Sequence, residues 1–382
     1  MNRKILAFVL ALGAAAWPFP ARAEEKAEEA PPSVSAKAAV VVNADDGTVL
    51  YAKNEKMHLA IASTTKIMTA LLTLEAARNE NRAVTIRPEM IRVEGSTMGL
   101  RSGDRLTLKD LAAGMLTVSG NDAANAAAFA VSGTLKMFAV RMNERAASLG
   151  MKDTHFVTPS GLDDAGHYSC AYDMALLACA AMKNTDFARI TGETELKIRF
   201  LNPEGTRTFE NHNKLLRMYS GCTGVKTGYT RKAGRCLVSS AEKDGVRVIA
   251  VTLNDPDDWA EHKTLLDYGF SRLVSRSFDD TDCRISLPAV GGAKDSVTVS
   301  GTDGGSLVLR KEEAETLTRT VELPRFLYAP ISAGQVLGKT CYRSGGKTVM
   351  ETELVSAEEI PKVERRKSWF ERFWEGILRL FS

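Results

Sequence analysis

Residues 225–253 read VKTGYTRKAGRCLVSSAEKDGVRVIAVTL. Runs rich in valine, leucine and isoleucine are separated by turn sequences near residues 229–232 and 243–245, a pattern that is typical of β-strands joined by short turns. The triplet Lys226-Thr227-Gly228 falls in the first of these strands. Its ammonium and hydroxyl groups can bind a carboxylate, and its glycine leaves the strand edge open to the backbone of a ligand.

Outward from this stretch, the sequence alternates between strand and helix patterns. Two short strands around an Asp-Asp-Gly turn predict a β-hairpin over residues 37–51. Apolar residues at helical spacing predict helices over 63–78, 122–131, 135–149 and 262–274. Residues 283–355 contain short alternating runs and Gly-Gly pairs, which predict a small all-β domain.

A second motif, Ser63-Thr64-Thr65-Lys66, opens the first of these helices. Positions i and i+3 share one face of a helix, so the sequence predicts that the Ser63 hydroxyl and the Lys66 amine are neighbours. Serine needs an adjacent base to become a nucleophile, and a lysine kept neutral by desolvation and a neighbouring cation can accept its proton. The helix N-terminus also brings backbone N–H groups to a developing oxyanion. The alternative is that Ser63 is only a helix N-cap.

A third motif, Ser119-Gly120-Asn121, lies between an apolar segment and a helix, which predicts a tight turn. The Ser119 hydroxyl can relay a proton between Lys66 and a leaving amine, and the Asn121 amide can hold a peptide group of a substrate. A helix cap is the simpler alternative. Each motif alone is a weak signal. Their order and their placement match the Ser-x-x-Lys, Ser-x-Asn and Lys-Thr-Gly set of a known group of serine enzymes.

The longer stretches around these motifs resemble the secreted D-alanyl-D-alanine carboxypeptidases, the low-molecular-mass penicillin-binding proteins. These stretches are IASTTKIMTA, LTVSGNDAANAAA, MNERAASLGMKDTHFVTPSGL, GHYSCAYDMA and GVKTGYTRKAG. The resemblance covers about residues 35–275, and the β-rich part resembles the C-terminal domain of that family. It implies an α/β (α+β) catalytic domain of the serine β-lactamase and transpeptidase type, in which helices flank an antiparallel sheet. A small all-β domain and an amphipathic C-terminal helix complete the implied architecture.

The resemblance also implies a role for each motif residue. Ser63 is the acylated nucleophile, Lys66 is the general base, and Ser119 is the third catalytic residue. The implied substrate-binding residues are Asn121, Lys226, Thr227, Gly228 and Tyr229. Lys226 and Thr227 anchor the terminal carboxylate of the substrate, and the backbone N–H groups of Ser63 and Tyr229 form the oxyanion hole. No metal and no organic cofactor is implied.

We therefore expect an exported serine peptidase that removes the terminal D-alanine of peptidoglycan stem peptides and is acylated by β-lactams. A β-lactamase or a DD-endopeptidase on the same scaffold is an alternative, and so is a non-catalytic receptor for β-lactams or muropeptides. Ser-Gly-Asn in place of Ser-Asp-Asn favours the carboxypeptidase, and Lys197 stands where a β-lactamase would have asparagine. The histidines form no His-Glu-x-x-His, which disfavours a zinc peptidase, and His167 is predicted to order a loop.

The two ends of the chain predict a location outside the cytoplasm. Residues 1–23 combine a basic start, an apolar run and a small-residue cleavage site, which indicates a signal peptide. In residues 359–382 the apolar side chains, tryptophan and phenylalanine among them, share one side of a helix with a net positive charge, which favours peripheral attachment to the outer face of the cytoplasmic membrane. Docking on its own domain or on a partner is the alternative. Between the ends we expect a linker (24–35), the catalytic domain (36–280) and the β-rich domain (281–358).

Composition narrows the class of protein further. With 44% hydrophobic and 25% charged residues the chain has the balance of a folded globular protein. Its net charge of +3 is accounted for by Arg3, Lys4 and Arg22 of the leader, so a broad basic face for nucleic acid is not expected. The six cysteines include no Cys-x-x-Cys, and buried free thiols are favoured over disulfides. The oligomeric state is left open.

Overall fold

The computed structural model describes residues 30–364 together with residues 369, 370, 373, 374 and 377. The predicted signal peptide, the first part of the predicted linker and most of the C-terminal segment lie outside the described residues. The central element is a five-stranded antiparallel sheet with the strand order β2-β1-β9-β8-β7. Its strands are β1 (Ala38–Asn43), β2 (Val49–Lys53), β7 (Cys222–Thr230), β8 (Gly234–Lys243) and β9 (Val246–Leu253). The hairpin and the strand run predicted from the sequence are therefore confirmed, and β7 lies at an edge of the sheet.

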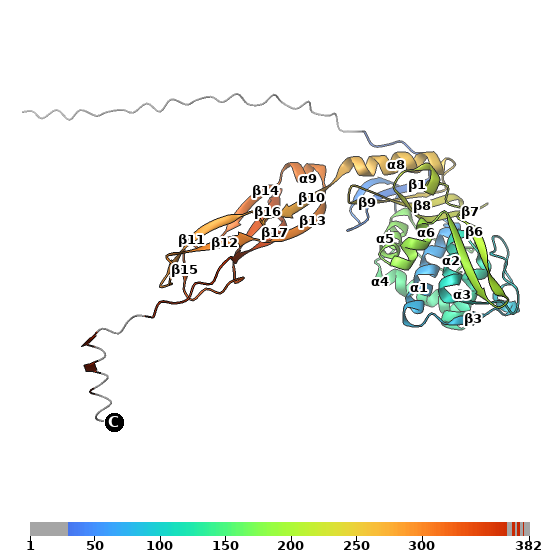
Figure 1. Ribbon diagram of the computed structural model, residues 1–382. Coiled ribbons are helices and arrows are strands. Elements are labelled where there is room, and N and C mark those ends of the chain that lie inside the picture. Colours follow the sequence, from blue (N-terminus) through green and yellow to red (C-terminus); the bar gives the residue numbers. More distant parts are fainter. Residues whose placement is uncertain (1–29, 365–368, 371–372, 375–376, 378–382) are drawn as a thin grey trace, which may run out of the picture. The chain divides into compact units, whose positions relative to one another are not determined.

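Helices cover both faces of this sheet (Figure 1). They are α1 (Lys66–Asn79), α2 (Leu108–Thr117), α3 (Asn121–Ser132), α4 (Leu135–Ser148), α5 (Ala171–Met182), α6 (Thr185–Gly192), α7 (Leu215–Met218) and α8 (Asp258–Arg272). Because side chains alternate along a strand, Val40 of β1 packs among the helices that include α1 and α5, whereas Val41 packs against α8. The predicted α+β architecture with flanking helices is confirmed.

Two parts of the catalytic domain differ from the expected elements. The first helix begins at Lys66 rather than at residue 63, because Ala62–Thr65 form a 3-10 turn before it. Helices α5 and α6 were not expected. Most of α5 is buried, so its sequence AYDMALLACAAM lacks the polar face that marks an amphipathic helix. Smaller elements complete this domain: β3 (Ala83–Thr85), the 3-10 turn Pro88–Met90, β4 (Arg105–Thr107), and the hairpin of β5 (Glu195–Leu201) and β6 (Glu204–Glu210).

His262 lies at the centre of the packing between α8 and the sheet. Its side chain is fully buried, and its two ring nitrogens contact the hydroxyl groups of Ser239 on β8 (2.6 Å) and Thr252 on β9 (2.9 Å). Burial lowers the pKa of His262 from 6.5 to about 3, so the folded protein keeps the ring neutral.

This burial predicts an acid-sensitive step in stability. The unfolded chain binds a proton at His262 below pH 6.5 and the folded chain does not, so the free energy of unfolding falls as the pH drops from 6.5 towards 3. We expect His262 to account for about 2 kcal/mol of loss between pH 7.5 and 5. Urea titrations measure the free energy of unfolding at each pH. In His262→Gln this free energy should fall by about 2 kcal/mol less between pH 7.5 and 5 than it does in the wild type. In His155→Gln, which replaces an exposed histidine, it should fall as much as in the wild type. Equal pH slopes for all three proteins would contradict the prediction.

The C-terminal β domain consists of strands β10–β17 and the single-turn helix α9. Its elements are β10 (Leu273–Asp279), β11 (Arg284–Val290), β12 (Ser296–Gly301), β13 (Asp303–Arg310), α9 (Lys311–Glu315), β14 (Thr318–Glu322), β15 (Leu327–Tyr328), β16 (Val336–Ser344) and β17 (Lys347–Ser356). Strands β10 and β13 pair with each other, and the remaining six form one sheet in the order β14-β16-β17-β12-β11-β15. Buried apolar side chains such as Val297, Val299 and Leu354 form the core of this sheet. The all-β fold that was predicted for this part of the chain is confirmed.

The described residues contain neither a disulfide bond nor a single helix that could span a membrane. All six cysteines are free thiols; Cys170, Cys179, Cys236 and Cys341 are buried, and Cys222 and Cys283 are half-buried. Within the described residues, no single helix is long and apolar enough to cross a membrane; α3 and α4 meet that test only as a pair, which is bent by 85°.

Candidate active site

Ser63 lies in the 3-10 turn that leads into α1, against the edge strand β7. Ala62 in this turn has φ of +47°, a left-handed conformation that costs free energy for any residue other than glycine. Gly228 packs directly against the turn, because a Cβ placed on it would lie 3.1 Å from the Ser63 nitrogen and 3.0 Å from that of Thr64. The glycine that the sequence predicted as part of the binding site therefore also allows β7 to approach the turn that carries Ser63.

Lys66 lies directly beside Ser63. Its Nζ is 2.8 Å from Ser63 Oγ and donates to the carbonyl oxygen of Ser160 (2.7 Å). The whole side chain is buried, and this burial holds the pKa of Lys66 well below its usual value of 10.5. The charge of Lys226 lowers the pKa further, and that of Asp122 acts in the opposite direction. The predicted pair is thus in contact, and its lysine is in an environment that favours the neutral amine.

Hydrogen bonds of the His167 side chain connect the loop that contains Ser160 to the 3-10 turn that contains Ser63. Two backbone N–H groups, those of Val157 and Thr158, donate to Nδ1 of His167, so Nε2 carries the proton and donates to Thr65 Oγ1 (2.8 Å). Burial lowers the pKa of His167 to about 4, which keeps the ring neutral near pH 7. Gly161 completes the contact: a Cβ there would lie only 1.9 Å from the Ala62 carbonyl oxygen. As predicted, His167 orders a loop.

The second motif forms the turn between α2 and α3. Ser119 is nearly buried and has φ of +60°, which is again uncommon for a residue with a side chain. Asn121 begins α3, and its Nδ2 donates to the carbonyl oxygen of Glu94 (2.6 Å). Its Oδ1 is buried and has no hydrogen-bond partner among the described residues. A buried acceptor without a donor is costly, so this atom is suited to receive an N–H group from a ligand.

The third motif lies on β7. The Lys226 side chain is buried, and its Nζ donates to the carbonyl oxygen of Thr227 (2.9 Å). Burial lowers its pKa from 10.5 to about 7. Thr227, Gly228 and Tyr229 line the pocket in front of Ser63. Tyr229, which is 67% exposed, lies at its rim.

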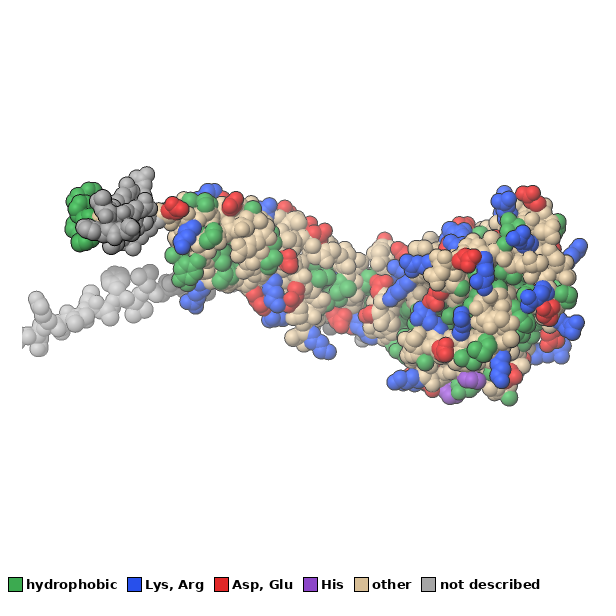
Figure 2. All heavy atoms as spheres, turned by 90° about the horizontal axis from the view of Figure 1, so that it is seen from below, with side chains coloured by type: hydrophobic (Ala, Val, Ile, Leu, Met, Phe, Trp, Pro, Cys, Tyr) green, Lys and Arg blue, Asp and Glu red, His purple; other side chains and the backbone are tan. Residues whose placement is uncertain are grey.

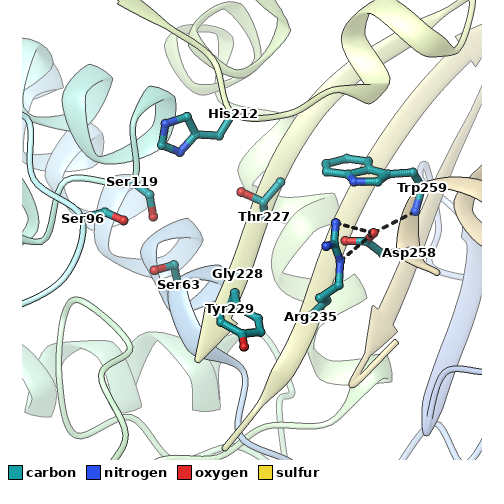
Figure 3. A pocket seen from close by; sticks show the side chains of 10 residues that line it. All are labelled: Ser63, Ser96, Ser119, His212, Thr227, Gly228, Tyr229, Arg235, Asp258 and Trp259. Carbon is teal, nitrogen blue, oxygen red and sulfur yellow. Dashed lines mark hydrogen bonds and ion pairs between the residues drawn. The ribbon is translucent and has the colours of Figure 1, made fainter. Parts of the chain in front are cut away.

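The three motifs meet at one pocket of about 290 Å³. It is lined by Ser63, Ser96, Ser119, His212, Thr227, Gly228, Tyr229, Arg235, Asp258 and Trp259. In Figure 3 the side chains of Ser63, Ser96 and Ser119 gather on one side of β7, and those of Arg235, Asp258 and Trp259 lie on the other. Burial and the charge of Lys226 both lower the pKa of His212, which favours a neutral ring.

Sequence reasoning missed Ser96, His212, Arg235, Asp258 and Trp259. Arg235 could have been found from the sequence, because the turn between β7 and β8 is short. Strands joined by such a turn pair in a defined register, and this register places Arg235 opposite Tyr229. Its guanidinium donates to the carboxylate of the nearly buried Asp258 (3.0 Å) and lies 6.0 Å from the centre of the Trp259 ring. Arginine stays charged at any physiological pH, so this group is a permanent cation on the pocket wall.

One group of potential metal ligands occurs among the described residues: Asp153, Cys170 and Asp173, which do not line this pocket. Burial raises the pKa of the Cys170 thiol to about 12, and the Asp173 carboxylate accepts hydrogen bonds from the Asp153 backbone N–H and the Thr154 hydroxyl. These hydrogen bonds tie the group into the fold, and none of its three residues lines the pocket that contains Ser63.

Comparison with known proteins agrees with this geometry. The chain is 34% identical to the D-alanyl-D-alanine carboxypeptidase DacF of Bacillus subtilis over 336 residues, 86% of each chain. It is 31% identical to DacC of Escherichia coli over 94% of this chain and 91% of that one. The crystal structure of penicillin binding protein 5 from Haemophilus influenzae matches with a TM-score of 0.64 and 29% identity, and covers 87% of this chain and 100% of that one.

The fold, the site and these relatives define a serine-type carboxypeptidase, a hydrolase. The family model for D-alanyl-D-alanine carboxypeptidase matches residues 24–257, and the model for the C-terminal domain of penicillin-binding protein 5 matches residues 286–362. The chain belongs to the D-alanyl-D-alanine carboxypeptidase family, and the resemblance seen in its motifs is confirmed.

Proposed function

We propose that this carboxypeptidase hydrolyses the bond between the last two D-alanines of a peptidoglycan stem peptide through an acyl-enzyme on Ser63. The observation that carries the proposal is the 2.8 Å contact between Ser63 Oγ and the fully buried amine of Lys66. The neutral amine can take the proton of the hydroxyl without help from a metal or an organic cofactor.

Acylation then follows from the arrangement of the three motifs. Lys66 removes the proton of Ser63 as the oxygen attacks the carbonyl carbon of the penultimate D-alanine, and the N–H groups of Ser63 and Tyr229 stabilise the oxyanion. The close packing of Gly228 on the Ser63 turn supports this pairing of N–H groups. The peptide bond breaks, and the leaving amine receives the proton from Lys66 through Ser119. The Oδ1 atom of Asn121 accepts an N–H group of the substrate backbone.

Deacylation completes the cycle. Water attacks the ester carbonyl while Lys66 again serves as the base, which releases the shortened peptide and returns the proton to Ser63. We propose that β-lactams acylate Ser63 as mimics of the D-Ala-D-Ala end and are released slowly. A receptor would use the same acylation step but would not turn over.

Release of D-alanine from an acylated Lys-D-Ala-D-Ala peptide tests this function. Repeated turnovers per molecule, with a penicillin adduct that maps to Ser63, are the expected result. A stable adduct without any release of D-alanine would overturn the carboxypeptidase in favour of the receptor.

Recognition of the substrate's terminal carboxylate is assigned to Lys226 and Thr227, with Arg235 as a further cation. Because the pKa of Lys226 is lowered to about 7, its charge is incomplete near neutral pH, whereas that of Arg235 is permanent. We expect Arg235→Gln to raise the KM for a peptide with a free terminal carboxylate about tenfold, the equivalent of one charge-assisted hydrogen bond.

The matched measurement uses the same peptide with an amidated C-terminus, whose KM should change little in Arg235→Gln. Arg231 lies in the turn between β7 and β8, close in sequence to Arg235, and is exposed. Arg231→Gln is therefore the control for a lost positive charge and should leave both KM values unchanged. An equal rise in KM for the free and the amidated peptide would show that Arg235 does not read the carboxylate.

We also propose that the enzyme is exported and held at the outer face of the cytoplasmic membrane by its C-terminal segment. The signal-like sequence of residues 1–23 supports export. Trp369, Phe370, Phe373 and Trp374 support attachment, because each of these aromatic side chains is more than half exposed. A location beside the cell wall would bring the Ser63 pocket to stem peptides.

A further inference from the structure

The end of the β domain where the C-terminal segment leaves carries exposed apolar side chains. Phe326, Tyr328, Val290 and Val363, which we call the apolar tip, are four of the five large apolar residues exposed in the described part of residues 281–364. We propose that this apolar tip is a second membrane contact, in which Phe326 and Tyr328 enter the lipid interface. This inference rests on the proposed attachment of the C-terminal segment and adds a docking surface to it.

Strand register explains why these side chains point outward. Strands β11 and β15 run parallel, with Ala289 opposite Leu327 and Val290 opposite Tyr328. Ala289 and Leu327 belong to the core of the β domain, so their neighbours face the opposite way. Tyr328 is accordingly 70% exposed.

Two further contacts bring the apolar tip together. The Phe326 ring packs edge-on against the Tyr328 ring, with 5.4 Å between the ring centres. The Val363 backbone N–H donates to the carbonyl oxygen of Gly291 (2.9 Å), which fixes Val363 beside the end of β11. Figure 2 shows hydrophobic side chains gathered at this end of the β domain. Isolated exposed apolar residues are ordinary, but a cluster with two aromatic rings marks a contact surface.

The residues that follow the apolar tip in the sequence favour a lipid surface as its binding partner. Trp369 is only six positions after Val363, so the aromatic part of the C-terminal segment begins at most about 21 Å from the apolar tip. Tyrosine and tryptophan are the side chains enriched at membrane interfaces, and both occur here. Lys362, Arg365, Arg366 and Lys367 add positive charge between the two aromatic groups, which complements anionic lipid headgroups.

Sedimentation of the full chain with vesicles of phosphatidylglycerol and phosphatidylcholine tests the proposal. We expect Phe326→Ser combined with Tyr328→Ser to weaken binding about tenfold, although the C-terminal segment is intact. The control pair is Met137→Ser with Val140→Ser on α4, two apolar side chains of similar exposure that should not affect binding. Thermal unfolding and D-alanine release from a soluble peptide should be unchanged in both. Hydrogen exchange of residues 325–329 should slow when vesicles are added to the wild type.

The outcomes separate this inference from the attachment on which it rests. If the wild type does not bind vesicles, the attachment fails and the inference fails with it. If the wild type binds but the Phe326/Tyr328 variant binds equally and residues 325–329 exchange at the same rate, the attachment stands and the inference is overturned. Slower exchange that depends on protein concentration and not on vesicles would also overturn it, by making a second copy of the chain the occupant.

Discussion

Replacement of Ser63 by alanine is expected to lower kcat for D-alanine release about 10⁴-fold or more and to abolish the covalent penicillin adduct. The variant keeps the pocket but lacks the oxygen that lies 2.8 Å from Lys66 Nζ. Folding should be unaffected, because α1 begins only at Lys66 and Ser63 is not a core residue. Single-turnover kinetics and intact-protein mass spectrometry measure the two losses separately.

Ser96→Ala is the matched control, since Ser96 lines the same pocket and its hydroxyl has no contact with Lys66. It should retain at least about a tenth of the wild-type kcat, because a surrounding polar group contributes far less than a nucleophile. If Ser63→Ala kept more than one hundredth of the activity or still formed the adduct, the nucleophile would have to be another pocket serine, Ser119 or Ser96.

Replacement of Lys66 by methionine is expected to lower kcat/KM about 10³-fold to 10⁴-fold, as loss of a positioned general base does.

The pH profile of the wild type is a stronger test of Lys66 as the base. Activity requires the neutral amine, so kcat/KM should rise with pH through the pKa of Lys66, which burial and the charge of Lys226 both lower.

Removal of the neighbouring charge should therefore shift this profile in a defined direction. In Lys226→Gln the repulsion that lowers the pKa of Lys66 is gone, so the pKa rises and the acidic limb moves to higher pH. Acylation by penicillin, followed at a series of pH values, measures the limb. His212→Gln serves as the comparison, because His212 lines the pocket but is not among the groups that lower the pKa of Lys66. If the acidic limb of the pH profile lay at the same pH in Lys226→Gln as in the wild type, Lys66 would not be the base.

The parts of the site that could be predicted from the sequence are those formed by residues close to one another in the chain. Ser63 and Lys66 are neighbours because they are three positions apart across the 3-10 turn that leads into α1, and this spacing is visible without a structure. The strands of residues 225–253 were equally predictable, because the turns between them are short and local. The β-rich pattern after residue 283 likewise gave the strands of the second domain.

The parts that could not be predicted depend on contacts between distant segments. His212 reaches the pocket from beyond the β5–β6 hairpin and Trp259 from α8, and no local pattern connects either of them to Ser63. The low pKa of Lys66 is also a product of tertiary packing, because it comes from burial and from a lysine 160 positions away. The sequence indicated that Lys66 must be neutral to act as a base, but it did not show which residues bury Lys66 or which cation lies near it.

The burial of the cysteines gives this protein a chemical resistance to oxidation. The thiolate is the form that reacts with oxidants and disulfides, and burial raises the pKa of Cys170 and Cys236 to about 12 and that of Cys179 to about 11. At pH 8 a thiol with a pKa near 12 is ionised in roughly one molecule in 10⁴. Oxidation of these three thiols would therefore be slow in an oxidising compartment, and cross-linking by air or by disulfide exchange would begin at other cysteines. Cys222 and Cys283, the two half-buried thiols, are the residues at which such damage would start.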